Sequence, residues 1–223
     1  MPYYLDFKQL SLETFMRKLV TDYLPPSRLI LKGDIEKRII CFKTLGIETV
    51  EELHFYLKKK SNWHKLQSFE TITEEYLTIL LRELNSLHPK SHKLTEFEDI
   101  SEETLNILNQ KGIKSTQHLY EAVEKLSDVK AASLFLGVSD DELLQLFQYS
   151  DLCRVKWVGP TFAQMLYQLE IKSVMELSGS NAEELHQRIN QLNQEKKIYK
   201  GQISLRDIQI VVQVAEELFR AFR

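Results

Sequence analysis

A short pattern that recurs four times constrains the fold of this chain more than any other feature. It reads Gly or Glu, then Ile or Val, then Ser or Thr at the start of a helix-forming run that ends on Leu. The copies span residues 46–53, 112–119 and 170–177, with a shorter copy at 137–143. Glycine ends a helix in left-handed geometry at low cost, and Ser or Thr caps the next helix. Each copy therefore predicts a corner between two helices.

The third copy departs from this rule at its first position, where Glu170 replaces glycine. A left-handed residue other than glycine costs about 1 kcal/mol. We expect this corner to be either strained or closed in another way.

The rest of the sequence predicts an all-α protein. Gly and Pro are rare, with 7 and 5 residues in 223, and apolar residues fall at helical three-and-four spacing rather than alternating. Besides a helix–hairpin–helix unit at 151–178, the pattern predicts helices at 6–23, 34–45, 49–60, 74–86, 101–111, 115–126, a short one ending at 136, 139–147, 181–196 and 204–222.

The segment at 87–93, Leu-His-Pro-Lys-Ser-His-Lys, is the predicted linker. It separates an N-terminal helical region, 1–87, with one degenerate repeat, from a pair of repeats at 94–223. His88 and His92 have the spacing of two metal ligands on one helical face, but Pro89 lies between them and opposes that helix. We expect a loop with two exposed histidines and no metal site.

Composition excludes several classes of protein. The net charge of −3 argues against a protein that coats nucleic acid. Residues 71–150 are acidic, with 7 Lys and Arg against 14 Asp and Glu. Cys41 and Cys153 lie far apart, which predicts reduced packing residues and a cytoplasmic protein. No apolar run spans a membrane, and the first residues lack a signal-peptide pattern. Catalytic, cofactor and metal motifs are missing, so we expect no enzyme and no cofactor.

Residues 152–163, Leu-Cys-Arg-Val-Lys-Trp-Val-Gly-Pro-Thr-Phe-Ala, resemble the hairpin of helix-hairpin-helix domains, which reads roughly Leu-x-x-Val-x-Gly-Ile-Gly-Pro-x-x-Ala. Trp157 replaces the first glycine of that motif. The resemblance implies tandem helix-hairpin-helix (SAM-like) repeats.

Three further phrases are similar to a bacterial family of unknown function built from tandem helix-hairpin-helix-like repeats, across about 76–218. They are Tyr-Leu-Thr-Ile-Leu-Leu-Arg-Glu-Leu-Asn-Ser at 76–86, Ser-Asp-Leu-Cys-Arg-Val at 150–155 and Leu-Asn-Gln-Glu-Lys-Lys at 192–197. This resemblance implies a fold and no activity.

In helix-hairpin-helix domains the glycines let the backbone approach a phosphate, and the amides of the following helix donate to it. Such contacts carry no sequence information. The resemblance therefore implies a non-enzymatic module that contacts the backbone of DNA or RNA. The candidate contacts are Arg154, Lys156, Trp157, Gly159, Thr161 and Lys172.

Two observations keep other interpretations open. Trp157 stands where a phosphate would approach and can instead pack as a hydrophobic plug. The equivalent hairpin of the preceding repeat carries four acids, Glu98, Asp99, Glu102 and Glu103, which repel phosphate. The alternative is a structural protein or a protein-interaction adaptor that uses the acidic middle third or an exposed aromatic residue, Trp63 or Trp157.

Overall fold

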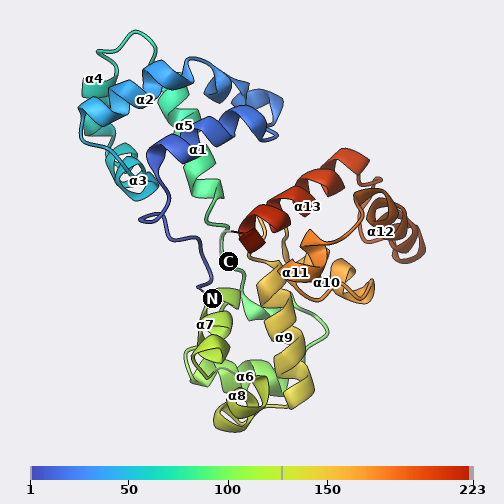
Figure 1. Cartoon of the computed structure of the whole chain (residues 1–223). Helices are drawn as coiled ribbons and strands as arrows, with labels where there is room; N and C mark the ends of the chain where they lie inside the picture. Colours follow the sequence, from blue (N-terminus) through green and yellow to red (C-terminus); the bar gives the residue numbers. More distant parts are fainter. Residues whose placement is uncertain (1, 127, 221–223) are drawn as a thin grey trace. The chain divides into compact units, whose positions relative to one another are not determined.

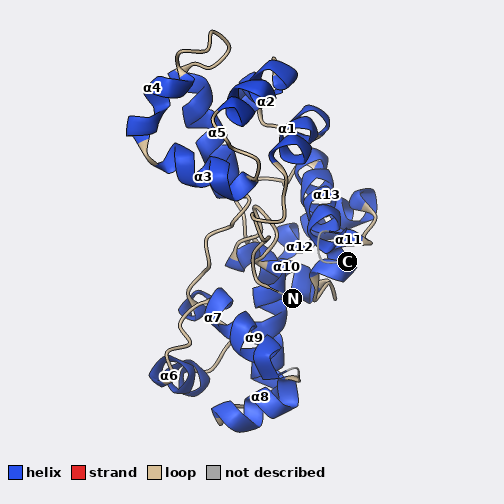
Figure 2. Cartoon of the chain, turned by 60° about the vertical axis from the view of Figure 1, so that its left-hand side comes forward, coloured by secondary structure: helices blue, strands red, loops and turns tan. Residues whose placement is uncertain are grey.

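The computed structural model describes residues 2–126 and 128–220. Within them all regular secondary structure is helical and no β-strand occurs, so the predicted all-α class is confirmed (Figure 1 and Figure 2). The chain divides into two compact units. One is Leu5–His88, and the other comprises the described residues of Met1–Tyr4 together with those of Pro89–Arg223.

The unit Leu5–His88 is built from five α-helices and two 3-10 helices. They are α1 (Leu12–Thr21), η1 (Pro26–Lys32), α2 (Ile35–Thr44), α3 (Val50–Lys58), η2 (Lys60–Asn62), α4 (Trp63–Leu66) and α5 (Glu74–Ser86). The helix predicted from residue 6 begins only at Leu12, because the Ser11 hydroxyl caps it by accepting the Thr14 N–H. The apolar faces of α1, α2, α3 and α5 share one core.

Trp63 belongs to that core. Only 4% of it is exposed, and its indole N–H donates to the Leu57 carbonyl at 2.8 Å. The prediction that Trp63 is an exposed aromatic residue is therefore wrong. A buried Trp needs a partner for its ring N–H, and the end of α3 supplies one.

His88 also departs from expectation. Its ring stacks on Phe7 with the centroids 3.7 Å apart, and Nε2 donates to the Leu5 carbonyl at 2.8 Å. Burial lowers the pKa of His88. His92 is likewise only partly exposed. The predicted pair of exposed loop histidines is not what the structure has, because both rings pack against neighbouring segments.

The second unit contains one 3-10 helix and eight α-helices. They are η3 (Leu94–Glu96), α6 (Glu102–Gln110), α7 (Thr116–Leu126), α8 (Val129–Leu136), α9 (Asp140–Leu152), α10 (Pro160–Gln168), α11 (Val174–Ser178), α12 (Ala182–Lys196) and α13 (Leu205–Arg220). Helix α9 is longer than the predicted 139–147. The end of the last predicted helix, 204–222, lies outside the described residues.

All four predicted corners are closed by the same kind of hydrogen bond, and in the short copy the Val138 N–H donates to the Ser133 carbonyl at 3.1 Å. The other three corners carry Ile. In each, the Ile of the pattern donates its N–H to a carbonyl five residues back, which closes the end of the preceding helix. The three bonds are Ile47 to Phe42 (3.2 Å), Ile113 to Leu108 (2.9 Å) and Ile171 to Leu166 (3.0 Å). The residue before each Ile is left-handed, with φ of 75° at Gly46, 80° at Gly112 and 61° at Glu170. The Glu170 corner is thus the strained alternative, closed in the same way as the glycine corners.

The start of the helix after each of the three Ile corners is also anchored by a hydrogen bond from its first turn. The Val50 N–H donates to the Leu10 carbonyl, and the Thr116 N–H donates to the His92 carbonyl, both at 2.9 Å. At the third corner a side chain takes over this role, since the Val174 N–H donates to Asp151 Oδ2 at 2.7 Å. Asp151 therefore closes the corner that follows the hairpin.

Candidate nucleic-acid interface at the hairpin

The hairpin is a tight connection between α9 and α10. Its turns are held by backbone bonds from Val155 N–H to the Leu152 carbonyl and from Val158 N–H to the Val155 carbonyl, both 3.0 Å. Val155 and Val158 are buried. Trp157, between them, has φ of 72° and is 45% exposed. The two valines anchor the loop and leave the indole outside, so Trp157 is no hydrophobic plug.

Arg154 lies inside the protein rather than on the hairpin surface. Its guanidinium donates to the carbonyls of Pro2 and Tyr3, to the Tyr120 hydroxyl and, at 2.5 Å, to Asp151 Oδ1. It also lies 4.6 Å from the centroid of the Tyr120 ring. Its side chain is 1% exposed. Arg154 therefore has its donors directed into the fold and away from solvent.

The first residues of the chain complete this buried cluster. The Tyr3 hydroxyl is 2.8 Å from Thr116 Oγ1, and the rings of Tyr3 and Tyr120 meet edge to face at 5.6 Å. Burial raises the pKa of both tyrosines, so both stay neutral hydroxyls. Asp151 carries the negative charge opposite Arg154, and it is the member that also bonds Val174.

Lys156 and Trp157 form a pair at the hairpin tip. Lys156 is largely buried, and its Nζ lies 4.5 Å from the centroid of the Trp157 ring. An ammonium over an indole face is a favourable cation–π contact. The arrangement places one positive charge beside the most exposed aromatic ring of the hairpin.

Helix α10 begins directly after this pair with its first turn uncapped by any side chain. Gly159 is the N-cap residue, Pro160 fills the first helical position, and Thr161 is exposed. The amides of Thr161 and Phe162 belong to the first turn, where helix N–H groups have no partner in the helix. Among the described residues none accepts a hydrogen bond from these two amides. They are donors at the positive end of a helix dipole.

Gly159 does not have the conformation that requires glycine. Its φ is −97°, and a side-chain carbon added there would lie 3.8 Å from Cε1 of His92. Approach to the Gly159 backbone therefore meets the His92 ring. His92 is a neighbour of the hairpin that the sequence pattern did not indicate.

Lys172 lies after α10 and forms an ion pair with Glu170. Its Nζ is 2.5 Å from Glu170 Oε2 and 5.2 Å from the centroid of the Tyr167 ring. The hydrogen bond with Glu170 raises the pKa of Lys172. Of the six predicted contacts, the structure groups Lys156, Trp157, Gly159 and Thr161 at the tip, places Arg154 in the interior and pairs Lys172 with an acid.

The acids of the preceding repeat are partly structural. Asp99 accepts from the Tyr149 hydroxyl and, at 3.0 Å, from Gln164 Nε2. Glu142 holds the start of α6 by accepting from the Ser101 N–H at 2.8 Å and from Thr104. These hydrogen bonds lower the pKa of Glu142. Part of the acidic character of this region therefore serves packing between helices.

The described residues contain no cluster of His, Cys, Asp and Glu that fits a metal ion. None of their helices has the length and apolar content needed to cross a membrane.

The fold and the hairpin define an all-α domain with repeated helical corners and one exposed tip. A family described as Domain of unknown function (DUF4332) matches residues 98–218, and the chain belongs to that family. The search of curated proteins found no match. The search of solved structures found none either.

Proposed function

We propose that the chain is a non-enzymatic binding module whose hairpin at 156–160 contacts the phosphate backbone of nucleic acid without sequence specificity. The observation that carries this proposal is Trp157, an indole that is 45% exposed although its backbone has φ of 72°. Left-handed geometry in a bulky residue is an outlier that the surrounding fold must maintain, and such outliers gather at binding sites.

The helix-hairpin-helix assignment is part of the same proposal. Trp157 stands where the motif has its first glycine, and its positive φ is the conformation that glycine takes easily. The four corners with matching hydrogen bonds support tandem repeats.

Each part of the tip has a role in this mechanism. The Trp157 ring stacks on an unpaired base or lies against a sugar, which is tolerant of sequence. The Lys156 ammonium, 4.5 Å from that ring, attracts the adjacent phosphate. The amides of Thr161 and Phe162 donate to the same phosphate, supported by the dipole of α10. Arg154 and Lys172 have no part in it.

With one cation at the tip, binding is weak and depends mainly on stacking. Single-stranded nucleic acid is the better ligand, because its bases are open to the indole. The logarithm of the affinity falls with the logarithm of salt concentration with a slope of about −0.7 for one neutralised phosphate on a single strand.

The test is a fluorescence anisotropy titration of labelled single-stranded and duplex oligonucleotides at several salt concentrations. Base stacking on an aromatic side chain contributes about 1–3 kcal/mol, so Trp157→Ala weakens single-strand binding by about 5- to 150-fold. Met175→Ala, a change of another exposed apolar residue in the same unit, leaves it unchanged. Absence of binding at low salt, or equal binding by Trp157→Ala, contradicts the proposal.

A cytoplasmic location is also proposed. What supports it is that Cys41 and Cys153 are both free and buried.

The adaptor alternative keeps one supporting observation. Trp63 is buried, so it offers no docking surface, and several acids of the middle third bond to neighbouring helices. Two apolar residues of α8, Leu134 and Phe135, lie in that same middle third and are exposed, which gives protein contact a physical basis.

A further inference from the structure

A stretch of the chain without acidic residues covers the end of α3, η2 and α4. Residues 53–69 carry four lysines and no Asp or Glu, and the lysines fall within eight positions. All four are exposed, and they are Lys58, Lys59, Lys60 and Lys65. Like charges this close repel one another. The fold therefore holds a dense positive surface here, formed by these four residues, which we call the α3–α4 lysine surface.

Every other lysine of the unit Leu5–His88 has a partner. Lys32 donates to two backbone carbonyls. The remaining ones form ion pairs with acids, and they are Lys8, Lys18, Lys37 and Lys43. Within the described part of the chain, no residue of the α3–α4 lysine surface forms an ion pair. The charge of this surface is therefore available to a ligand.

These lysines are not needed to close the end of α3, because other donors do so. Asn62 Nδ2 donates to the Tyr56 carbonyl at 3.1 Å. Trp63 Nε1 donates to the Leu57 carbonyl at 2.8 Å. Lysines near a helix C-terminus commonly bond its last carbonyls. In the residues that the structure describes, no ammonium group of the α3–α4 lysine surface donates to a carbonyl, so that role does not account for it.

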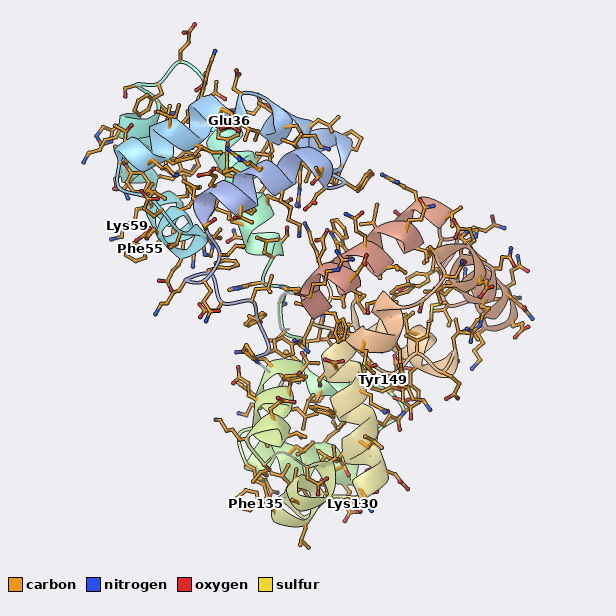
Figure 3. All side chains as sticks on the ribbon, in the orientation of Figure 1. Glu36, Phe55, Lys59, Lys130, Phe135 and Tyr149 are labelled. Atoms are coloured by element: carbon orange, nitrogen blue, oxygen red, sulfur yellow. The ribbon has the colours of Figure 1, made fainter. Side chains whose placement is uncertain are left out.

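Two of the ammonium groups lie beside aromatic rings. Lys59 Nζ is 4.6 Å from the centroid of the Phe55 ring, and the two side chains lie side by side at the end of α3 in Figure 3. Lys60 Nζ is 5.4 Å from the centroid of the Trp63 ring. A cation–π contact holds a charge in place without neutralising it. The Phe55 ring, which is 63% exposed, is thus already paired with a cation, and this favours contacts through charge over base stacking.

Duplex nucleic acid is the ligand that suits such concentrated positive charge. Double-stranded DNA carries one negative charge per about 1.7 Å of its axis, and lysines that neutralise its phosphates release counterions. An anionic membrane is the other extended polyanion, but binding in its interface requires a broad apolar face. Among residues 53–69, all of which the structure describes, Phe55 is the only exposed large hydrophobic residue. The charge and the apolar content together favour a duplex.

We propose that the α3–α4 lysine surface binds the phosphate backbone of duplex nucleic acid without sequence specificity. It uses none of the hairpin residues, so it is independent of the function proposed for Trp157. The hairpin prefers single strands because it stacks bases, whereas this surface prefers a duplex because of its charge density. When the four lysines neutralise four phosphates, the logarithm of the affinity falls with the logarithm of salt concentration with a slope of about −3.6.

The test is a fluorescence anisotropy titration of the full chain with a labelled duplex at several salt concentrations. Lys59→Gln with Lys60→Gln removes two of the four charges, so the slope drops to about −1.8 and the affinity at low salt falls at least about tenfold. The matched control is Lys8→Gln with Lys37→Gln, which removes the same charge from exposed positions of the same unit and leaves the slope unchanged. Trp157→Ala also keeps the slope, which separates this surface from the hairpin.

Circular dichroism of each variant checks that the helices remain. A wild-type chain that does not bind a duplex at low salt overturns the proposal. Equal slopes for the Lys59→Gln, Lys60→Gln variant and its control overturn it as well, as does duplex binding that is lost in Trp157→Ala. Binding to vesicles of phosphatidylserine and phosphatidylcholine without binding to a duplex assigns the surface to a membrane and contradicts the proposal.

Discussion

Arg154 and Trp157 lie three residues apart on one hairpin and have opposite environments. The Arg154 side chain is 1% exposed and bonds to residues from three separate parts of the chain. Trp157 is 45% exposed on a left-handed backbone. Both were candidates for the same contact with nucleic acid. The difference shows that the inner end of the hairpin holds the fold together and only its tip is available to a ligand.

The cause of this division is Asp151. Its carboxylate pairs with Arg154 and also accepts the Val174 N–H. At the Gly46 and Gly112 corners the corresponding N–H groups, of Val50 and Thr116, donate to a backbone carbonyl instead. The third corner has no such carbonyl in that role, so it uses a side chain, and that side chain brings the guanidinium inward. The guanidinium in turn binds the carbonyls of Pro2 and Tyr3.

Removing Asp151 has the largest expected effect on the inner end. Asp151→Ala leaves Arg154 as a buried charge without its partner, and it leaves the Val174 amide without an acceptor. Breaking a buried pair in this way costs about 3–5 kcal/mol. Arg154→Met costs less, because the Asp151 carboxylate keeps its bond with Val174.

Urea unfolding monitored by circular dichroism measures both variants. Glu183→Ala, at an exposed acid in the first turn of α12, is the matched control and changes stability by less than about 0.5 kcal/mol. An Asp151→Ala variant as stable as that control contradicts the account of the inner end.

Alanine substitutions at two glycines compare a helical corner with the hairpin tip. Gly112 has φ of 80°, so Gly112→Ala costs about 1–2 kcal/mol. Gly159, at the hairpin, has φ of −97° and only an ordinary contact with His92, so Gly159→Ala costs about 0.5 kcal/mol or less. The difference between the two unfolding free energies is the quantity to measure. Equal losses indicate that Gly159 has a backbone role beyond the turn.

The smallest expected changes in stability are gains. Glu170→Gly relieves a left-handed residue with φ of 61° and loses only a surface ion pair with Lys172. It raises the free energy of unfolding by about 0.5–1 kcal/mol. Trp157→Gly gives a gain of the same order and at the same time weakens oligonucleotide binding. A loss of stability in Trp157→Gly shows that the indole contributes packing that its exposure does not suggest.

The sequence predicts the local parts of this molecule well. The all-α class and the range 74–86 of α5 are confirmed, and the left-handed corners follow from Gly-Ile and a capping Ser or Thr, because these signals act over a few residues. The start of α1 and the length of α9 are predicted less well, since caps and packing shift helix ends.

The burial of a single side chain depends on residues far away in the sequence, so local sequence patterns do not predict it. Arg154 bonds Tyr120, which is 34 positions away, and Tyr3, which is 151 positions away. No pattern in residues 151–161 indicates those partners. Trp63 is buried for a similar reason, since its position in the core is set by the packing of several helices.

The most direct test of the central claim compares Trp157→Ala with Arg154→Met in one experiment, measuring unfolding free energy and affinity for a single-stranded oligonucleotide at low salt. The account predicts that Trp157→Ala keeps wild-type stability and loses at least about fivefold in affinity, as expected for a lost stacking platform. It predicts that Arg154→Met loses stability and, under conditions where it remains folded, binds as tightly as wild type. A folded Arg154→Met that no longer binds, or a Trp157→Ala that binds undiminished, contradicts the division between a structural inner end and a binding tip.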